Sequence, residues 1–319
     1  MFANLSNISV AKFNYDLSTT DNNISYMFYN CINLYTVSFK DTEEIELKHK
    51  IINLDASRIF YNCSSLSTVN FYDSLYYSYV NVSYMLYNCN KLNLFSFEKI
   101  IKVSDLSGMF FNCYSLTSFN FTKFEPKSNN DYMVNMSYLF YNCHNLEIPI
   151  NNEASQFITN DMRYMFYNCT KLKEIKLINI KIGDSTNMSY AFYNCQNLEI
   201  VDWYYQPSNP SDMRYIFYNC SNINSIKLPI QQTNRNINMT RMFYNCFNAK
   251  TIEFGTSSVY YPNDIHEMFY NCISLENIDL RNIMHTDNVS DIAYLFYNCF
   301  KLNSLTLVFS NLLNIKNLK

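Results

Sequence analysis

The chain has 319 residues, 48% of them hydrophobic, so it is long enough to bury a large apolar core. Its formal net charge of −3 gives no electrostatic reason to expect nucleic acid or an anionic membrane surface as a partner. No stretch approaches the roughly 20 apolar residues of a membrane-spanning helix, so we expect no direct membrane insertion.

The first predicted element is a strand within residues 2–12, which matches the second half of a repeat that fills the rest of the chain. Leu5, Ile8 and Val10 correspond to the apolar positions of the later strands, with Phe2 where later copies carry cysteine. Residues 1–21 lack the basic and uninterrupted apolar regions of a secretory signal. Two interpretations stay open: a natural start without a helix, or a piece of a longer protein whose signal and anchor lie elsewhere.

The first complete repeat is built around the phrase Met27-Phe-Tyr-Asn-Cys31. The phrase returns ten more times, at intervals between 24 and 32 residues, and contains all 11 cysteines of the chain. Such a period indicates a solenoid or repeat array. The copies end at Cys31, Cys63, Cys89, Cys113, Cys143, Cys169, Cys195, Cys220, Cys246, Cys272 and Cys299.

Each copy predicts a short helix that ends near its cysteine, counted here as position 0. Position −8 is Asn or Asp in all eleven copies, and these residues favour helix N-caps. Apolar residues follow at −7, −4, −3 and 0, as in Met162, Met165, Phe166 and Cys169. This spacing is typical of a helix of about two turns with one buried face.

A short strand is predicted after each cysteine, because apolar residues at +6 and +8 have the two-residue period of a strand, as in Ile175 and Leu177. Stacked copies then give an α/β solenoid, a leucine-rich-repeat-like right-handed coil with a parallel sheet on one face and short helices on the other. We expect one repeat domain, 1–319: the partial repeat 2–12, eleven helix–strand repeats over about 21–309, and a tail at 310–319.

Four segments interrupt the regular pattern. We expect a solvated loop or short helix at 41–50 and a surface bulge, containing Pro126, at 122–134. A missing residue and Pro149 predict a sheet irregularity at 146–150. The tail 311–319 is predicted as a weak amphipathic helix that covers the last coil.

The cysteines are expected to be buried free thiols. All occupy one position on the apolar face, and neighbouring helices would pack about 8–10 Å apart, beyond the reach of a disulfide. Disulfides and metal binding remain minor alternatives, and no CxxC or Cys/His cluster supports a metal site. We therefore predict no metal and no cofactor.

No catalytic constellation is recognisable. The four histidines, His49, His144, His266 and His285, lie at unrelated repeat positions, and no phosphate-binding loop or nucleophile elbow is present. We predict that the protein is not an enzyme.

The first candidate binding surface is the outward column of the sheet at +7. It becomes charged with alternating sign in the later repeats, at strand spacings of about 4.8 Å. Mutual neutralisation of cross-strand neighbours is one interpretation, and a mixed-charge docking strip for a protein ligand is the other. The strip comprises Lys176, Asp202, Lys227, Glu253 and Asp279.

The second candidate surface is the outward face of the helices, where tyrosine occupies −2 in ten copies and −5 in seven. Tyrosine is a good contact residue in protein interfaces, whereas lateral stacking of the rings is the structural alternative. Asn at −1, present in every copy, is interpreted as hydrogen-bonding the backbone at the bend between helix and strand, an internal ladder rather than a ligand site. The candidate binding tyrosines are Tyr167, Tyr193, Tyr218, Tyr244 and Tyr270.

The repeat resembles the 26-residue repeat of the BspA-like branch of the leucine-rich-repeat family. The matching residues include Met268-Phe-Tyr-Asn-Cys272 followed by Ser274-Leu275, Ile278 and Leu280. The match spans about residues 2–307, with Asn in place of the usual Gly before the cysteine. The resemblance implies an extracellular or cell-surface protein that binds host or other cell-surface proteins.

The leading hypothesis is therefore a non-enzymatic, adhesin-type module with a protein partner. Self-association into a structural assembly is the second hypothesis, and an intracellular scaffold is the third.

Overall fold

The computed structural model describes residues 2–14, 23–40, 53–71, 79–95, 97, 101–121, 124–126, 133–147, 157–177, 180–203, 210–228, 236–255, 261–281, 283, 289 and 291–307. The chain divides into two compact units, Met1–Ile158 (unit 1) and Thr159–Lys319 (unit 2), and each is described by itself. The single domain 1–319 stays a prediction.

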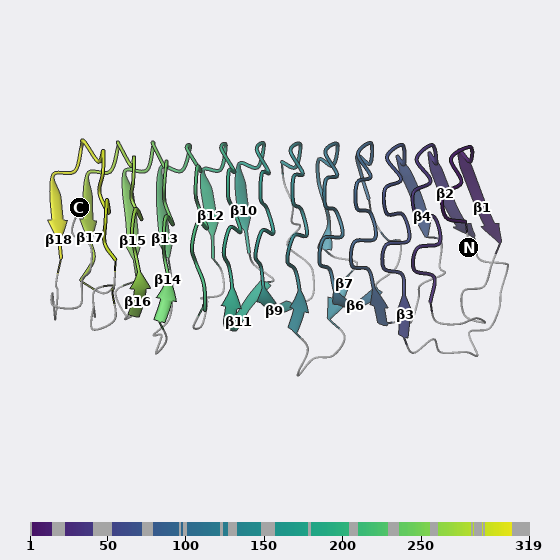
Figure 1. The fold of residues 1–319 in the computed structure, drawn as a ribbon, viewed down its shortest axis with the longest axis horizontal. Helices are drawn as coiled ribbons and strands as arrows, with labels where there is room; N and C mark the ends of the chain where they lie inside the picture. The colour runs from purple at the N-terminus through teal and green to yellow at the C-terminus, as the bar shows by residue number, and fades with distance from the viewer. Residues whose placement is uncertain are drawn as a thin grey trace. The chain divides into compact units, whose positions relative to one another are not determined.

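The strands that follow the cysteines form parallel sheets, as predicted (Figure 1). In unit 1 they lie in the order β1-β2-β4, and in unit 2 they form the pair β10-β12 and the sheet β13-β15-β17-β18. Equivalent repeat positions face each other, as in Thr36↔Thr68. The strands are β1 (Val10–Asn14), β2 (Thr36–Lys40), β4 (Thr68–Phe71), β10 (Glu174–Lys176), β12 (Ile200–Asp202), β13 (Ser225–Leu228), β15 (Thr251–Phe254), β17 (Asn277–Asp279) and β18 (Ser304–Thr306).

A second set of parallel strands, which the sequence did not predict, precedes the cysteines and ends near position −8. In unit 1 these strands lie in the order β8-β6-β5-β3, and β7 also pairs with β6. In unit 2 β14 pairs with β16. The pairing shifts register after Val80 and after Ile237. The strands are β3 (Asn53–Asp55), β5 (Tyr79–Asn81), β6 (Ile101–Asp105), β7 (Phe124–Pro126), β8 (Met133–Asn135), β9 (Phe157–Asp161) at the division, β11 (Ile180–Asn187), β14 (Asn236–Asn238) and β16 (Tyr261–Asp264).

The predicted helices are wrong: the described residues contain no helix, and two successive tight turns replace each one. In the first copy Met27 N–H donates to Ile24 O at 3.2 Å and Cys31 N–H donates to Phe28 O at 3.2 Å. These bonds span three residues, whereas an α-helix joins residues four apart. Each copy therefore contains a double turn, defined as positions −7 to 0.

Alternate N–H groups of the double turn leave the coil and bond the next one. In the first copy the N–H groups of Ile24, Tyr26 and Phe28 donate to carbonyl groups of the second copy at 2.8, 3.2 and 2.8 Å. Asn30 continues the series to Tyr61 O at 2.8 Å. This ladder replaces the helical bonds, because a helix of two turns is marginal and leaves most of its end groups unpaired.

The double turn needs left-handed backbone at two positions. At −1 every copy has Asn, with φ between 59° and 63°. Position −5 is also left-handed, with Tyr26 at 57° and Gly108 at 56°. A positive φ at the third residue is what a type II turn requires, and Asn tolerates it better than most residues. The apolar spacing at −7, −4, −3 and 0 is thus compatible with a helix and with this double turn.

The N-terminal partial repeat starts three residues earlier in the repeat than predicted. Phe2 stacks on Phe28, with ring centroids 5.7 Å apart, so it occupies −3 rather than the cysteine position. Asn4 has a φ of 61° and accepts a bond from the Asn30 amide at 3.0 Å, so it occupies −1. Leu5 therefore stands where later copies have cysteine.

The predicted bulge at 122–134 is wrong in part, because Phe124 is fully buried and β7 pairs with β6 in parallel. The other predicted irregularities, 41–50, most of 146–150 and the tail 311–319, lie outside the described residues.

The core of each unit is a regular stack of apolar side chains. The −3 phenylalanines of successive copies stack at 5.4 Å for Phe166 and Phe192, and at 5.5 Å for Phe28 and Phe60. The cysteines are free, and all but the half-buried Cys299 are buried, which confirms the predicted thiols. Each bonded thiol donates to a backbone oxygen of the preceding coil, as from Cys63 to Phe28 O at 3.1 Å.

Candidate protein-binding faces

The charged strip lies on consecutive strands of unit 2, at the outward +7 position of β10, β12, β13, β15 and β17 (Figure 1). Lys176 faces Asp202 across β10 and β12, and Lys227 faces Glu253 across β13 and β15. The parallel register sets charges of opposite sign beside each other in these two pairs, as the sequence predicted. Glu253 and Asp279 occupy the same repeat position on the paired strands β15 and β17 and carry the same sign.

The strip does not use its charges for ion pairs between strands. Lys176 Nζ lies 3.6 Å from Glu174 Oε1 on the same strand, and Asp279 pairs with Arg281 two residues later. In the described part of the chain, no ion pair joins Asp202, Lys227 or Glu253 to a partner. Among the described residues, the charges of the strip are therefore not neutralised by ion pairs between neighbouring strands.

The −2 tyrosines of unit 2 stack face to face along the coils, as the structural alternative predicted. Their ring centroids lie 4.5–4.7 Å apart, and the rings are inclined by 2–17°. Such stacks contribute about 0.5–1.5 kcal/mol per pair beyond area burial. The stacked faces are covered, so the half-buried rings present edges and hydroxyl groups to solvent. The column comprises Tyr167, Tyr193, Tyr218, Tyr244, Tyr270 and Tyr297.

A second aromatic column at −5 contains charged members that the sequence analysis missed. In unit 1 the guanidinium of Arg58 lies 5.7 Å from the Tyr26 ring and 5.1 Å from the Tyr84 ring. In unit 2 Arg241 lies over Tyr215 and forms a bidentate ion pair with Glu267 at 2.9–3.0 Å. The sequence could have indicated these contacts, because Arg and Glu replace Tyr in some copies at position −5.

The two columns of unit 2 lie side by side. Tyr164 and Tyr167 are 5.7 Å apart with a 50° tilt, and Tyr215 and Tyr218 are 5.6 Å apart with a 41° tilt. Burial, together with the flanking phenols, raises the pKa of Tyr193 to about 12. The Tyr193 phenol therefore stays protonated and able to donate a hydrogen bond at neutral pH.

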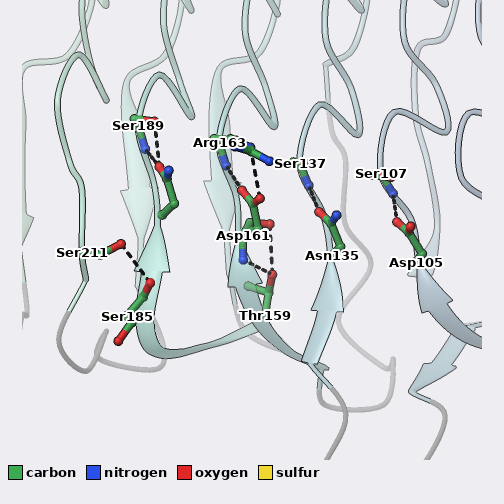
Figure 2. Close-up of polar contacts among 11 residues, drawn as sticks. Asp105, Ser107, Asn135, Ser137, Thr159, Asp161, Arg163, Ser185, Ser189 and Ser211 are labelled. Carbon is green, nitrogen blue, oxygen red and sulfur yellow. Dashed lines mark hydrogen bonds and ion pairs between the residues drawn. The ribbon is translucent and has the colours of Figure 1, made fainter.

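The −8 residue holds each double turn with an Asx turn rather than a helix cap. In every copy its Oδ1 accepts the N–H of the residue two positions later, as from Asp105 to Ser107 at 2.8 Å and from Asn135 to Ser137 at 2.9 Å (Figure 2). In two copies of unit 2 the residue at −6 is arginine. Arg163 Nε lies 3.1 Å from Asp161 Oδ2, and Arg214 Nε lies 3.0 Å from Asp212 Oδ2.

The −1 asparagines form an internal ladder, as predicted, but their side chains bond each other. The Asn112 amide donates to Asn88 Oδ1 at 2.7 Å and accepts from the Asn142 amide at 2.8 Å. Each unit contains such bonds, as from Asn271 to Asn245 in unit 2 at 2.8 Å, and they occupy these amides with each other.

Within the described ranges, no group of three or more His, Cys, Asp or Glu side chains is arranged to hold a metal ion. In the same ranges, no helix has the length and apolar character needed to cross a membrane.

Comparison with known proteins identifies one family. The model described as "BspA type Leucine rich repeat region (6 copies)" matches residues 38–135, 133–261 and 188–318. No curated protein matches the chain.

Among solved structures, a leucine rich cell surface protein from Faecalibacterium prausnitzii A2-165 is 17% identical, covering 95% of this chain and 83% of its own, with a TM-score of 0.43. A leucine-rich repeat protein from Bacteroides ovatus is 18% identical, covering 93% of this chain and 92% of its own, with a TM-score of 0.37. A third, from Eubacterium ventriosum, is 13% identical, covering 94% of this chain and 78% of its own, with a TM-score of 0.39.

Proposed function

The chain belongs to the BspA-type leucine-rich-repeat family, and from this premise we propose that it is a non-enzymatic module that recognises host or cell-surface proteins. Leucine-rich repeats are generally protein-interaction scaffolds. The observation that carries the proposal is the charged strip of unit 2, which sets Lys176 beside Asp202 and Lys227 beside Glu253, with no ion pair between these strands among the described residues.

The strip suits a protein partner because rows of alternating charge select a complementary surface and disfavour like-charged ones. Its backbone is fixed by parallel pairing, so ordering the strip on binding costs little entropy. An adhesin-type role at the cell surface completes the proposal, and it rests on the family alone.

The test is a binding screen of the full chain against purified extracellular-matrix and host-cell-surface proteins. The strip variant combines Lys176→Glu, Lys227→Glu and Glu253→Lys. The control, Lys171→Glu, changes the net charge by the same amount and alters an exposed lysine just after a cysteine and outside the strip. We expect the strip variant to weaken binding about tenfold or more and the control to change it less than twofold. Equal binding by both would remove the strip as the docking surface.

Self-association is the second candidate function. Phe300 and Leu305 of unit 2 are 79% and 41% exposed, and exposed apolar side chains favour contacts between copies. Light scattering over a concentration series decides between the candidates. A mass that rises steadily with concentration supports assembly, and a constant monomer mass contradicts it.

A further inference from the structure

We propose that the two tyrosine columns of unit 2, with their flanking arginines, form a docking surface for a polyproline II segment that carries an acidic residue at every third position. This deepens the protein-binding function proposed above and rests on it. The surface, called the tyrosine–arginine face, comprises Tyr164, Tyr190, Tyr215, Tyr167, Tyr193 and Tyr218, with Arg163 and Arg214.

The tyrosines form two parallel rows with a constant offset. Within the −5 row the ring centroids of Tyr164, Tyr190 and Tyr215 lie 4.7 and 4.6 Å apart. The −2 row beside it has the same spacing, 4.7 Å and then 4.6 Å. Because each ring is held by its neighbours, the rows offer rigid contact area, and aromatic-lined surfaces are the usual docking sites of polyproline II segments.

Two arginines lie beside the rows at position −6, on coils separated by one intervening coil. Arg163 and Arg214 are 46% and 47% exposed, whereas the carboxylates that they contact, Asp161 and Asp212, are 18% and 17% exposed. The arginine heads are therefore more exposed than the carboxylates that they contact. Figure 2 draws the contact between Arg163 and Asp161. Their ion pairs use Nε, and in the described part of the chain neither arginine bonds through its Nη atoms. Those atoms suit an incoming carboxylate.

The arginines adjoin the −5 row in the chain itself, because Arg163 directly precedes Tyr164 and Arg214 directly precedes Tyr215. Burial and the phenols of Tyr215 and Tyr164 raise the pKa of Tyr190, and the positive charge of Arg214 opposes that rise. Arg214 thus lies close enough to the −5 row to act on it electrostatically. A ligand lying along the rows meets both.

The coil spacing selects the conformation of the ligand. Two coils of the −5 row amount to about 9.3 Å. A polyproline II helix rises about 3.1 Å per residue with three residues per turn, so its repeat is also about 9.3 Å. An extended strand repeats every 6.6 Å or so on one side, and an α-helix every 5.4 Å or so. Only the first matches a step of two coils, which is the repeat separation of Arg163 and Arg214.

Unit 1 lacks the charged part of this surface. The position of the two arginines is occupied there by buried serines, among them Ser83, Ser107 and Ser137. The proposal therefore concerns unit 2 alone.

The test measures fluorescence anisotropy of labelled peptides with the full chain at low ionic strength. One peptide carries five glutamates separated by two prolines, and the other carries five glutamates separated by three prolines. We expect the first to bind about two- to fivefold more tightly, since only it can engage both arginines. The variant Arg163→Gln with Arg214→Gln should abolish this preference. Arg281→Gln, which removes another arginine paired with an aspartate two residues earlier, should preserve it.

Several results would overturn the inference: equal binding of both peptides by the wild-type chain, no binding of either, or a preference that survives the double arginine variant. The wild-type comparison needs no variant, so it remains decisive if the double variant fails to fold. Loss of this inference leaves the charged strip untouched, because the matrix-protein screen and its strip variant report on different residues.

Discussion

The asparagine before each cysteine serves the fold in two ways. Its backbone adopts the left-handed conformation that ends the double turn, and its side-chain amide bonds the equivalent amides of neighbouring coils. The first role depends on conformational preference, and the second depends on hydrogen bonding. The two can be separated by mutation.

We expect Asn112→Ala to lower the free energy of unfolding by about 2–3 kcal/mol. Roughly 1 kcal/mol comes from the left-handed backbone and about 1 kcal/mol from each lost amide bond. Asn112→Gly keeps the backbone free to adopt a φ of 59° and loses only the bonds, so it should be milder by about 1 kcal/mol. Urea unfolding of the three proteins measures the difference. Equal losses in both variants would show that the backbone conformation contributes nothing.

At the scale of the element, the double turn and the columns beside it constrain each other. Gly108 occupies the −5 position, where other copies carry large side chains, and has a φ of 56°. A Cβ built there would overlap the ring of Tyr84, which lies over it from the preceding coil. The absence of a side chain at Gly108 therefore makes room for the Tyr84 ring.

Gly108→Ala should accordingly destabilise unit 1 by about 1–3 kcal/mol through overpacking. In a Tyr84→Ala background the same substitution should cost only the left-handed backbone penalty, roughly 1 kcal/mol. A double-mutant cycle by thermal or urea unfolding measures this coupling. Additive effects would mean that the Tyr84 ring moves aside without cost.

The sequence predicts the strands after the cysteines from the two-residue period of apolar residues such as Ile175 and Leu177. It favours buried thiols because all cysteines share one apolar repeat position, too far from the next copy for a disulfide. The helices failed because apolar residues at −7, −4, −3 and 0 fit a helix and a double turn equally well. The distinguishing signal was Asn at −1, a residue that favours left-handed backbone. The strands before the cysteines were not predicted. Register shifts, as after Val80, interrupt the alternation of apolar and polar residues that would indicate a strand.

The candidate site was predictable in its parts but not in its arrangement. The alternation of Lys176, Asp202, Lys227 and Glu253 follows from the repeat, and parallel pairing placed these residues as expected. The role proposed for Arg163 and Arg214 depends on their side chains being more exposed than the aspartates that they contact. Sequence spacing does not predict this difference in exposure.

At the scale of the whole molecule, the buried thiols make stability sensitive to alkaline pH. Burial raises the pKa of Cys63 to about 12 and that of Cys299 to about 11, and it raises the pKa of Cys89 well above its ordinary value of 9.0. Unfolded thiols ionise from about pH 8.5. Above that pH the folded state binds more protons than the unfolded state, so stability falls as pH rises.

We expect full stability below about pH 8.5 and a progressive loss as pH rises from there through about 11–12. The slope is about 1.4 kcal/mol per pH unit for each buried thiol. Urea midpoints at pH 7.5 and pH 10, in reductant, measure it. A variant with Cys89→Ala and Cys113→Ala lacks two of the buried thiols, so its stability should fall less steeply with pH, by about the amount that two thiols contribute. An unchanged slope would assign the alkaline sensitivity to other groups.

The ladder between double turns joins each position of a coil to nearly the same position of its neighbour. If one coil were duplicated, the new coil would form with its neighbours the same hydrogen bonds that the original forms. If one coil were deleted, the two coils on either side of it could pair in the same way. Unequal recombination within the gene can then change the number of copies without creating an unmatched junction. We expect natural relatives of this chain to differ in length by whole coils, while their loops drift freely in size.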